Sequence, residues 1–271
     1  MLYIVATPIG NLEDITYRAV KVLSSVDLIL AEDTRHSRRL LDHYQIQTKL
    51  MAYHEHNEAE VTPRLIQELE AGKSMALISD AGTPLISDPG FDLIRAASEK
   101  GISISPIPGP CAAIAALCAS GMATDKFTFA GFLPHKSVAK KAKLQELKAM
   151  KTTLVLYESP HRLLDTLSDI TEIFGPAHSV MLAKEISKQF ERFFRGTLAE
   201  TLELFKEDPR LTQGEFVILI APFLSQNTAR MDISVEEALH DLAAALPKSK
   251  ASEIVAKWSG LPKRSLYQGL L

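Results

Sequence analysis

The first hundred residues alternate short, mostly apolar segments with amphipathic ones, and this alternation constrains the fold more than any other feature. Leu2–Ala6, Asp27–Glu32 and Ser74–Ser79 have the length and composition of strands, and helical patterns such as Thr16–Ser24 and Val61–Glu70 lie between them. Strands separated by helices are joined by crossover connections, which favours a mainly parallel sheet. Because these strands are almost wholly apolar, we expect helices to cover both sheet faces.

The second half of the chain has a different pattern. His178–Ala183 and Phe190–Arg195 are predicted as successive strands with no helix between them, which indicates a mixed sheet. The change follows the turn-like segment Gly121–Asp125. We therefore predict an N-terminal α/β domain over residues 1–121 and a second α/β domain over residues 122–222.

A third, small module is predicted at the C-terminal end, over residues 233–271. The polar segment Leu224–Arg230 before it has the composition of a linker. Ser249–Lys257 and Pro262–Leu270 have helical patterns. The small residue, turn glycine and core aliphatic that a helix-turn-helix needs are present at Ala256, Gly260 and Leu266. A plain packing hairpin is the alternative.

Composition excludes several classes of protein. The chain has 271 residues, of which 46% are hydrophobic and 23% charged, as in globular proteins of about two domains. Its apolar runs are shorter than the ~20 residues of a membrane span, and the N-terminus lacks the basic region of a signal peptide, so we expect a cytoplasmic protein. Cys111 and Cys118 are too far apart on one helix for a disulfide, and no spacing suggests a metal site.

Three glycine- and proline-rich turns follow predicted strands in the first domain: Ala6–Leu12, Ser79–Pro84 and Ile107–Ala113. In an open α/β sheet, ligands bind beyond the carboxyl ends of the strands, where such turns converge. Glycine lets the backbone approach a ligand closely. Each turn alone could be an ordinary loop, since glycine and proline are common in loops, but three in succession favour a ligand site. Common dinucleotide and P-loop motifs are absent from the sequence.

These turns resemble the signature turns of the tetrapyrrole-methylase superfamily. Glu32–Ser37, Phe132–Lys136 and Tyr157–Arg162 are similar to one branch of it, the cytidine 2′-O-methyltransferases of small-subunit ribosomal RNA. The resemblance covers essentially the whole chain, and its one minor departure is Cys111, where many relatives have serine. It implies a two-domain α/β fold, methylation of RNA, and a homodimer.

The resemblance also implies a cofactor, S-adenosylmethionine, in the cleft between the two domains. By the family pattern, the residues that bind it would be Pro8, Ile9, Gly10, Asp80, Ala81, Gly82, Thr83, Pro110, Cys111, Ala112, Leu156, Tyr157, Gly214 and Phe216.

The reaction that the resemblance implies would benefit from a general base, because a ribose 2′-hydroxyl is a poor nucleophile. The candidates are Asp33, Glu158, His161, Lys184 and Glu185. Lys184 and Glu185 follow each other at a strand end and would point to opposite faces, so at most one of them could enter the cleft. Each candidate could equally be a solvated charge or a helix cap, and the sequence does not choose among them.

The formal net charge of −3 does not favour binding to RNA, so local basic segments would have to make any contact with it. The candidates for RNA binding are Arg35, Arg38, Arg39, His135, Lys136, Lys140, Lys141, Lys143, Lys263 and Arg264. Solvated helix faces explain the same residues. Two other functions stay open on this sequence: C-methylation of a tetrapyrrole precursor, and a non-catalytic RNA-binding role in ribosome assembly.

Overall fold

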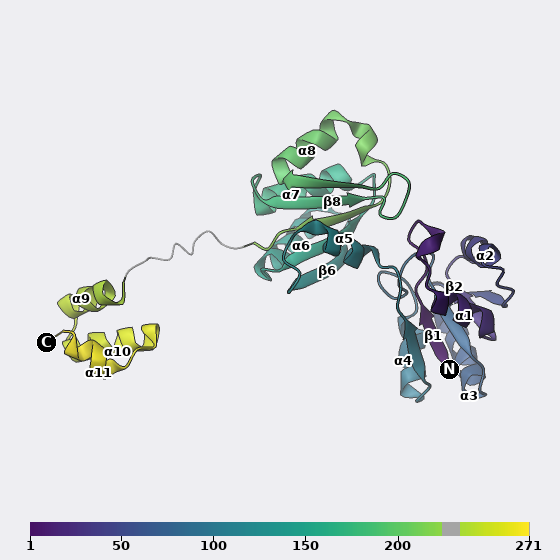
Figure 1. Ribbon diagram of the computed structural model, residues 1–271, viewed down its shortest axis with the longest axis horizontal. Coiled ribbons are helices and arrows are strands. Elements are labelled where there is room, and N and C mark those ends of the chain that lie inside the picture. The colour runs from purple at the N-terminus through teal and green to yellow at the C-terminus, as the bar shows by residue number, and fades with distance from the viewer. Residues whose placement is uncertain (224–233, 271) are drawn as a thin grey trace. The chain divides into compact units, whose positions relative to one another are not determined.

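The computed structural model describes residues 1–223 and 234–270 (Figure 1). The chain divides into two compact units, Met1–Phe223 and Leu224–Leu271. The first unit contains two five-stranded sheets, which we call the first and second sheet. The predicted linker Leu224–Arg230 lies outside the described residues.

The first sheet is parallel throughout, as predicted, with strand order β3-β2-β4-β1-β5. The three predicted turns follow β1, β4 and β5, and these strands lie next to one another in the sheet, with β1 between β4 and β5. Their carboxyl ends therefore meet at one edge of the sheet. The strands are β1 (Leu2–Val5), β2 (Leu28–Ala31), β3 (Leu50–Ala52), β4 (Met75–Ile78) and β5 (Ile104–Ile107).

Helices cover both faces of the first sheet. Successive side chains of each strand point to opposite faces, so each face presents apolar residues for helices to bury. Leu28 and Leu30 pack against α3 and α4, whereas Ile29 and Ala31 pack against α1 and α2. The α1 helix begins after Thr16, whose side chain accepts a hydrogen bond from the backbone N–H of Ala19. The helices are α1 (Tyr17–Ser25), α2 (Thr34–His43), α3 (Glu58–Glu70) and α4 (Phe91–Glu99).

The second sheet is mixed, as predicted, with strand order β6-β7-β10-β8-β9. Strands β6 and β7 are parallel, and the other neighbouring pairs are antiparallel. The strands are β6 (Phe127–Phe132), β7 (Thr153–Glu158), β8 (Ser179–Lys184), β9 (Arg192–Thr197) and β10 (Phe216–Ile220).

The helix α5 (Ala112–Ser120) corrects the predicted boundary between the two α/β domains. Ala113, Ala116 and Leu117 pack against β7, β8 and β10, so α5 covers a face of the second sheet. By packing, the boundary therefore falls before α5, near Gly109, and not at residue 121. The opposite face is covered by α6 (Ser137–Ala149), α7 (Leu163–Phe174) and α8 (Leu198–Glu207).

The C-terminal unit has three described helices, α9 (Val235–Ala245), α10 (Lys248–Ser259) and α11 (Lys263–Gln268). Leu239, Val255 and Leu266 form its core, and Ala256 packs against them. Gly260 ends α10 in the left-handed conformation, with a φ of 75°. This agrees with the predicted helix–turn–helix pattern. No helix within residues 1–223 and 234–270 is long and apolar enough to cross a membrane.

Candidate cofactor and substrate site

Hydrogen bonds join the three predicted turns. The backbone groups of Thr7 and Gly82 form an antiparallel bridge, with N···O distances of 2.9 and 3.0 Å. The Thr83 hydroxyl donates to the carbonyl oxygen of Pro110 at 3.0 Å. Gly109 lies so close to Ala6 that a Cβ would come within 2.8 Å of the alanine Cβ. The turns therefore form one continuous wall, as the sequence predicts.

This wall borders a cavity of about 490 Å³ between the first and second sheets. That volume is within the range of small-molecule sites. Of the residues that the resemblance implied for the cofactor, those that line the cavity are Ile9, Asp80, Ala81, Gly82, Thr83, Cys111, Ala112, Tyr157 and Phe216.

Five of the residues implied for the cofactor do not line the cavity: Pro8, Gly10, Pro110, Leu156 and Gly214. For Leu156 the reason is strand alternation. Its buried side chain packs on the face covered by α6 and α7, while its neighbour Tyr157 points to the cavity face. A contact from Leu156 to the cofactor would therefore have to come from its backbone, and this contact stays a prediction.

The sequence analysis missed several residues that line the cavity: Ile86, Ser87, Asp88, Phe132, Ser159, Pro160, Ala183, Ile186, Glu215 and Val217. One signal could have revealed some of them. The turn-forming segment Ser87-Asp88-Pro89-Gly90 follows the second glycine turn after a few residues. Apart from Ile86, the others lie on strands of the second sheet or in loops next to them, and only the packing of the two sheets brings them to the cavity.

Two loops beside the cavity have unusual backbone conformations. Leu85 and Ser87 have φ angles of 73° and 74°, and Glu185 and Ser187 have φ angles of 51° and 64°. Residues other than glycine adopt positive φ at a cost of roughly 1 kcal/mol or more each. We call residues 85–88 the first loop and residues 185–188 the second loop. Each places its isoleucine, Ile86 or Ile186, on the cavity wall.

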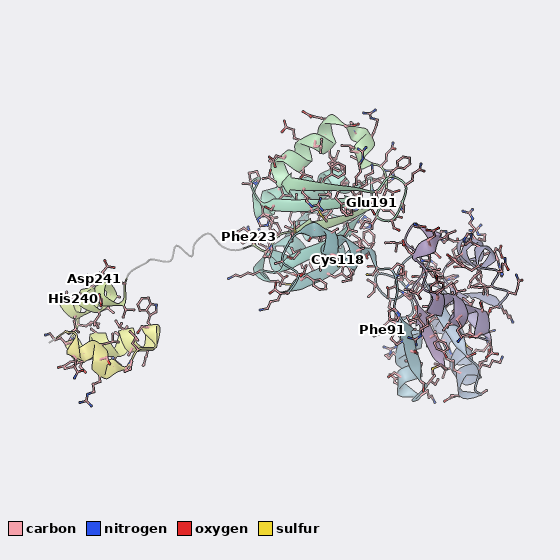
Figure 2. The ribbon with its side chains drawn as sticks, viewed as in Figure 1. Phe91, Cys118, Glu191, Phe223, His240 and Asp241 are labelled. Atoms are coloured by element: carbon pink, nitrogen blue, oxygen red, sulfur yellow. The ribbon has the colours of Figure 1, made fainter. Side chains whose placement is uncertain are left out.

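Each loop packs against a glycine that belongs to the other sheet. Ser87 Oγ would be 3.3 Å from a Cβ on Gly131 of β6. A Cβ on Gly10, in the first turn, would overlap Lys188 Cγ and lie 3.3 Å from the Ile186 carbonyl oxygen. The second loop is also held by hydrogen bonds from the Ser187 hydroxyl to Asp14 and from its backbone N–H to Glu191, which is labelled in Figure 2. Substituting either glycine would therefore disturb the contact between the sheets.

Asp88 is the most perturbed acid on the cavity wall. Burial raises the pKa of its carboxyl to about 6, and the negative charges of Glu32 and Asp80 add to the effect, which a hydrogen bond from Ser79 opposes. Glu32 has a raised pKa for the same reasons, burial first and the charge of Asp80 second. A carboxyl with a pKa near neutrality can exchange a proton under physiological conditions.

Two other titratable side chains on the wall are held in structural contacts. The Glu158 side chain is 0% exposed, and its carboxylate accepts hydrogen bonds from the Ser159 backbone and the Thr166 hydroxyl and pairs with Arg162. The Tyr157 hydroxyl accepts from the backbone N–H of Ala113 at 3.2 Å. Burial raises the pKa of Tyr157 to about 12.

The other predicted catalytic candidates lie away from the cavity. Lys184 Nζ donates to the Leu211 carbonyl oxygen at 2.9 Å. Glu185 Oε1 accepts from Lys188 Nζ and from the backbone N–H of Glu215. Neither residue is among those that line the cavity, and their catalytic roles stay predictions.

Asp33 and His161 are likewise outside the wall. Asp33 is the N-cap of α2 and accepts hydrogen bonds from the backbone of Arg35 and His36, which hold the pKa of its carboxyl below the usual value. His161 is exposed. Both fit the structural alternatives considered for them.

The predicted RNA-binding lysines of α6 are mostly occupied by acids of α7. Lys140 is 3% exposed, and its Nζ pairs with Asp169 and donates to Thr166, so RNA cannot reach it, and its predicted role is wrong. Lys141 pairs with Asp169 and Glu172. These two lysines, which were predicted to bind phosphates, therefore form ion pairs between α6 and α7.

Other predicted basic residues remain accessible. Lys143 is half-buried and pairs with Glu146 on its own helix. The exposed ones are Arg35, Arg38, Arg39, His135, Lys136, Lys263 and Arg264. Arg35 and Arg38 border a surface hollow between the start of α2 and β3.

Comparison with known proteins assigns the family. Residues 1–202 match the model described as Tetrapyrrole (Corrin/Porphyrin) Methylases, and residues 230–271 match the RsmI C-terminal HTH domain. The chain is 50% identical to "Ribosomal RNA small subunit methyltransferase I" of Pasteurella multocida over 99% of this chain and 95% of that protein. The protein with the same name in Haemophilus influenzae is 49% identical, over 99% and 95%.

The same fold occurs in the crystal structure of uroporphyrin-III C-methyl transferase from Thermus thermophilus complexed with S-adenyl homocysteine. It covers 80% of this chain and 96% of that one, with a TM-score of 0.56 at 18% identity. Fold, full-length identity and both domain matches agree. The chain belongs to the tetrapyrrole methylase family, in the branch of the ribosomal RNA small subunit methyltransferases I.

Proposed function

We propose that this protein transfers the methyl group of S-adenosylmethionine to the ribose 2′-hydroxyl of a cytidine in 16S ribosomal RNA. The observation that carries the proposal is the cavity of about 490 Å³ walled by the three joined turns, in a chain that is 50% identical to a ribosomal RNA methyltransferase over almost its full length. The specific nucleotide and the 2′-oxygen come from the sequence resemblance.

The residues present fit the cofactor. Its adenine needs apolar walls, which Ile9, Ile186 and Phe216 supply. Its cationic sulfur is favoured by a carboxylate such as that of Asp80, and no lysine or arginine lies among the lining residues. When bound, the cofactor supplies an activated methyl group. The protein orients the acceptor hydroxyl and keeps water away, which supplies much of the rate gain in such a transfer.

An exposed aromatic ring gives the cavity a feature suited to a nucleotide. Phe132 is 55% exposed at the cavity wall, and its ring contacts that of Tyr157 edge-on at 5.7 Å between centroids. Proteins that bind unpaired RNA bases commonly stack them on such rings. This supports a single, unstacked nucleotide as the acceptor.

The C-terminal unit would supply affinity for RNA. Lys263 and Arg264 open α11 and are exposed, which is where a helix-turn-helix presents basic residues to nucleic acid. Lys263→Glu combined with Arg264→Glu should weaken binding to the small ribosomal subunit. The dependence of log affinity on log salt should become shallower by about 1 to 2. The matched control is Lys21→Glu with Lys100→Glu, which changes the net charge equally at two exposed residues of the first domain, one in α1 and one directly after α4.

The test of the reaction is methyl transfer from labelled S-adenosylmethionine to small subunits purified from cells that lack this protein, followed by mapping of the modified nucleotide. Label on the 2′-oxygen of a cytidine is expected, and label on a base or on no RNA would refute the proposal. The homodimer and the cytoplasmic location stay predictions, which light scattering of the purified protein and cell fractionation test.

A further inference from the structure

A ribose hydroxyl can be methylated only if its proton has somewhere to go. As the oxygen bonds to the methyl carbon, the carbon–sulfur bond breaks and its electron pair stays on sulfur, which loses its positive charge. The hydroxyl proton must leave at the same site, and a positioned base lowers the barrier to that step. The question for this structure is which side chain of the cavity wall can receive the proton.

Most acidic groups on the wall are already engaged. Asp80 Oδ1 accepts the backbone N–H of Asp33 at 3.0 Å. Glu215 is largely exposed and pairs with Lys188 at 2.9 Å. Glu158 and Tyr157 are held as described above, the first by three donors and the second with a hydroxyl that stays protonated at neutral pH.

Asp88 differs from all of these in its surroundings. It lies on the cavity wall, and the charged groups that face it are carboxylates: Glu32 from the end of β2 and Asp80 from the end of β4. Tyr157 of β7 also faces it. Within residues 1–223 and 234–270, no cation is among the groups that act on Asp88, so no ion pair there competes for its oxygens.

The backbone holds Asp88 in place. Leu85 and Ser87 keep positive φ angles directly before it, and Ser87 packs against Gly131 of the second sheet. A conformation that costs energy and aims a side chain into a cavity is typical of functional loops.

We propose that the Asp88 carboxylate accepts the proton of the ribose hydroxyl that is methylated, an inference that rests on the proposed function. Its pKa of about 6 leaves the carboxylate ionised at neutral pH, yet basic enough to take up a proton in the transition state. After transfer, the proton leaves to solvent, because Asp88 is only partly buried.

The first test needs no cofactor. Titration of the Asp88 carboxyl by ¹³C NMR in the cofactor-free protein should give a midpoint near pH 6. Glu32→Gln removes a nearby negative charge and should move that midpoint to lower pH. A wild-type midpoint near the ordinary value of aspartate would overturn the proposal.

The second test is the pH dependence of kcat/KM for methyl transfer to small subunits. The wild-type value should rise with pH and level off near pH 6. Asp88→Asn should lack this rise and be slower by roughly 10²- to 10⁴-fold, with unchanged cofactor affinity in calorimetry. Asp88→Glu should regain the rise at a reduced rate. Glu32→Gln should move the rise to lower pH and keep the plateau.

Asp92→Asn is the matched control, because Asp92 is a half-buried acid of α4 that pairs with Arg95 and does not line the cavity. It should leave the profile unchanged. Asp88→Asn that keeps the wild-type rate and profile, or that loses cofactor affinity, would overturn the role of Asp88. Failure of wild-type protein to label RNA would instead refute the proposed function, and the two failures are therefore distinguishable.

Discussion

The first loop, Leu85–Asp88, and the second loop, Glu185–Lys188, use the same backbone device with opposite electrostatics. Both have positive φ at their first and third residues, and both place an isoleucine on the cavity wall. The second loop ends in Lys188, whose charge is balanced by Glu185 and Glu215 at 3.0 and 2.9 Å. The first loop ends in Asp88, which faces other carboxylates.

The difference separates a structural contact from a reactive one. Burial opposes the charge of Lys188, but its hydrogen bonds to Glu215 and Glu185 outweigh this and raise its pKa, so the lysine stays a fixed cation between the sheets. For Asp88 the hydrogen bond from Ser79 does not outweigh burial and the charge of Glu32, so the pKa of its carboxyl is raised to about 6. Two loops with similar backbones can therefore differ in role: the second holds the two sheets together, and the first presents a titratable carboxyl.

The largest effect should come from filling the space beneath the second loop. Gly10→Val would force Lys188 and the Ile186 carbonyl away from the first turn. Overpacking of this kind costs about 1–3 kcal/mol of unfolding free energy, and we expect cofactor affinity to fall roughly tenfold, about 1.4 kcal/mol. Urea unfolding and calorimetry measure the two.

Lys188→Ala provides the control for that change, because it removes the side chain that the new methyl groups would meet. The double variant should recover part of the lost stability and affinity. Strictly additive losses would show that the Gly10 contact is not what holds the second loop.

The two loops should also respond oppositely to pH. The native pKa of Asp88 is raised, so the folded protein binds an extra proton between about pH 4 and 6, and stability is lost as pH rises through this window. Asp88→Asn should therefore stabilise the protein at pH 8, on the order of 1 kcal/mol after allowance for solvent screening. This gain should vanish below about pH 4.

Glu185 has the opposite sign. Burial opposes its charge, but hydrogen bonds from the Glu215 backbone and Lys188 outweigh burial and lower its pKa. Its ionisation stabilises the fold above the unfolded pKa of about 4.3, and that stability is lost as pH falls through the native pKa. Glu185→Gln should destabilise at pH 8 and less so in acid. Urea titrations at several pH values measure both variants. If Asp88→Asn and Glu185→Gln change the unfolding free energy at pH 8 in the same direction, the contrast between the two loops is wrong.

The smallest effect concerns backbone strain. Ser87→Gly should raise the unfolding free energy by up to about 1 kcal/mol, because glycine adopts positive φ without steric cost. Ser187→Gly should gain less, because it also loses the hydrogen bond from the Ser187 hydroxyl to Asp14. Thermal unfolding compares the pair directly, and a larger gain at Ser187 would contradict the expected order.

Sequence patterns predicted the elements of the fold well and the site only in part. The three turns follow neighbouring strands of a parallel sheet, so their convergence was predictable from strand ends alone. Asp88 was missed because the turn-forming segment around it indicates a loop but does not identify this aspartate as a site residue. Of its charged neighbours, Asp80 is close in the chain, but Glu32 follows a different strand and meets Asp88 only in the folded sheet.

The lysine-rich helix α6 was over-interpreted for the same reason. The density of lysines on α6 is readable in the sequence, but the acids that neutralise Lys140 and Lys141 lie on α7. Likewise, α5 follows a strand of the first sheet yet covers the second.

The sequence by itself determined the parallel and mixed sheets, the helix–turn–helix pattern and the convergence of the three turns, because periodicity and turn chemistry act over a few residues. Tertiary structure alone decided which charges are paired, which side of β7 meets the cavity, and how the two loops lock the sheets together. Pairing, burial and pKa depend on groups far apart in the chain, and only packing sets those distances.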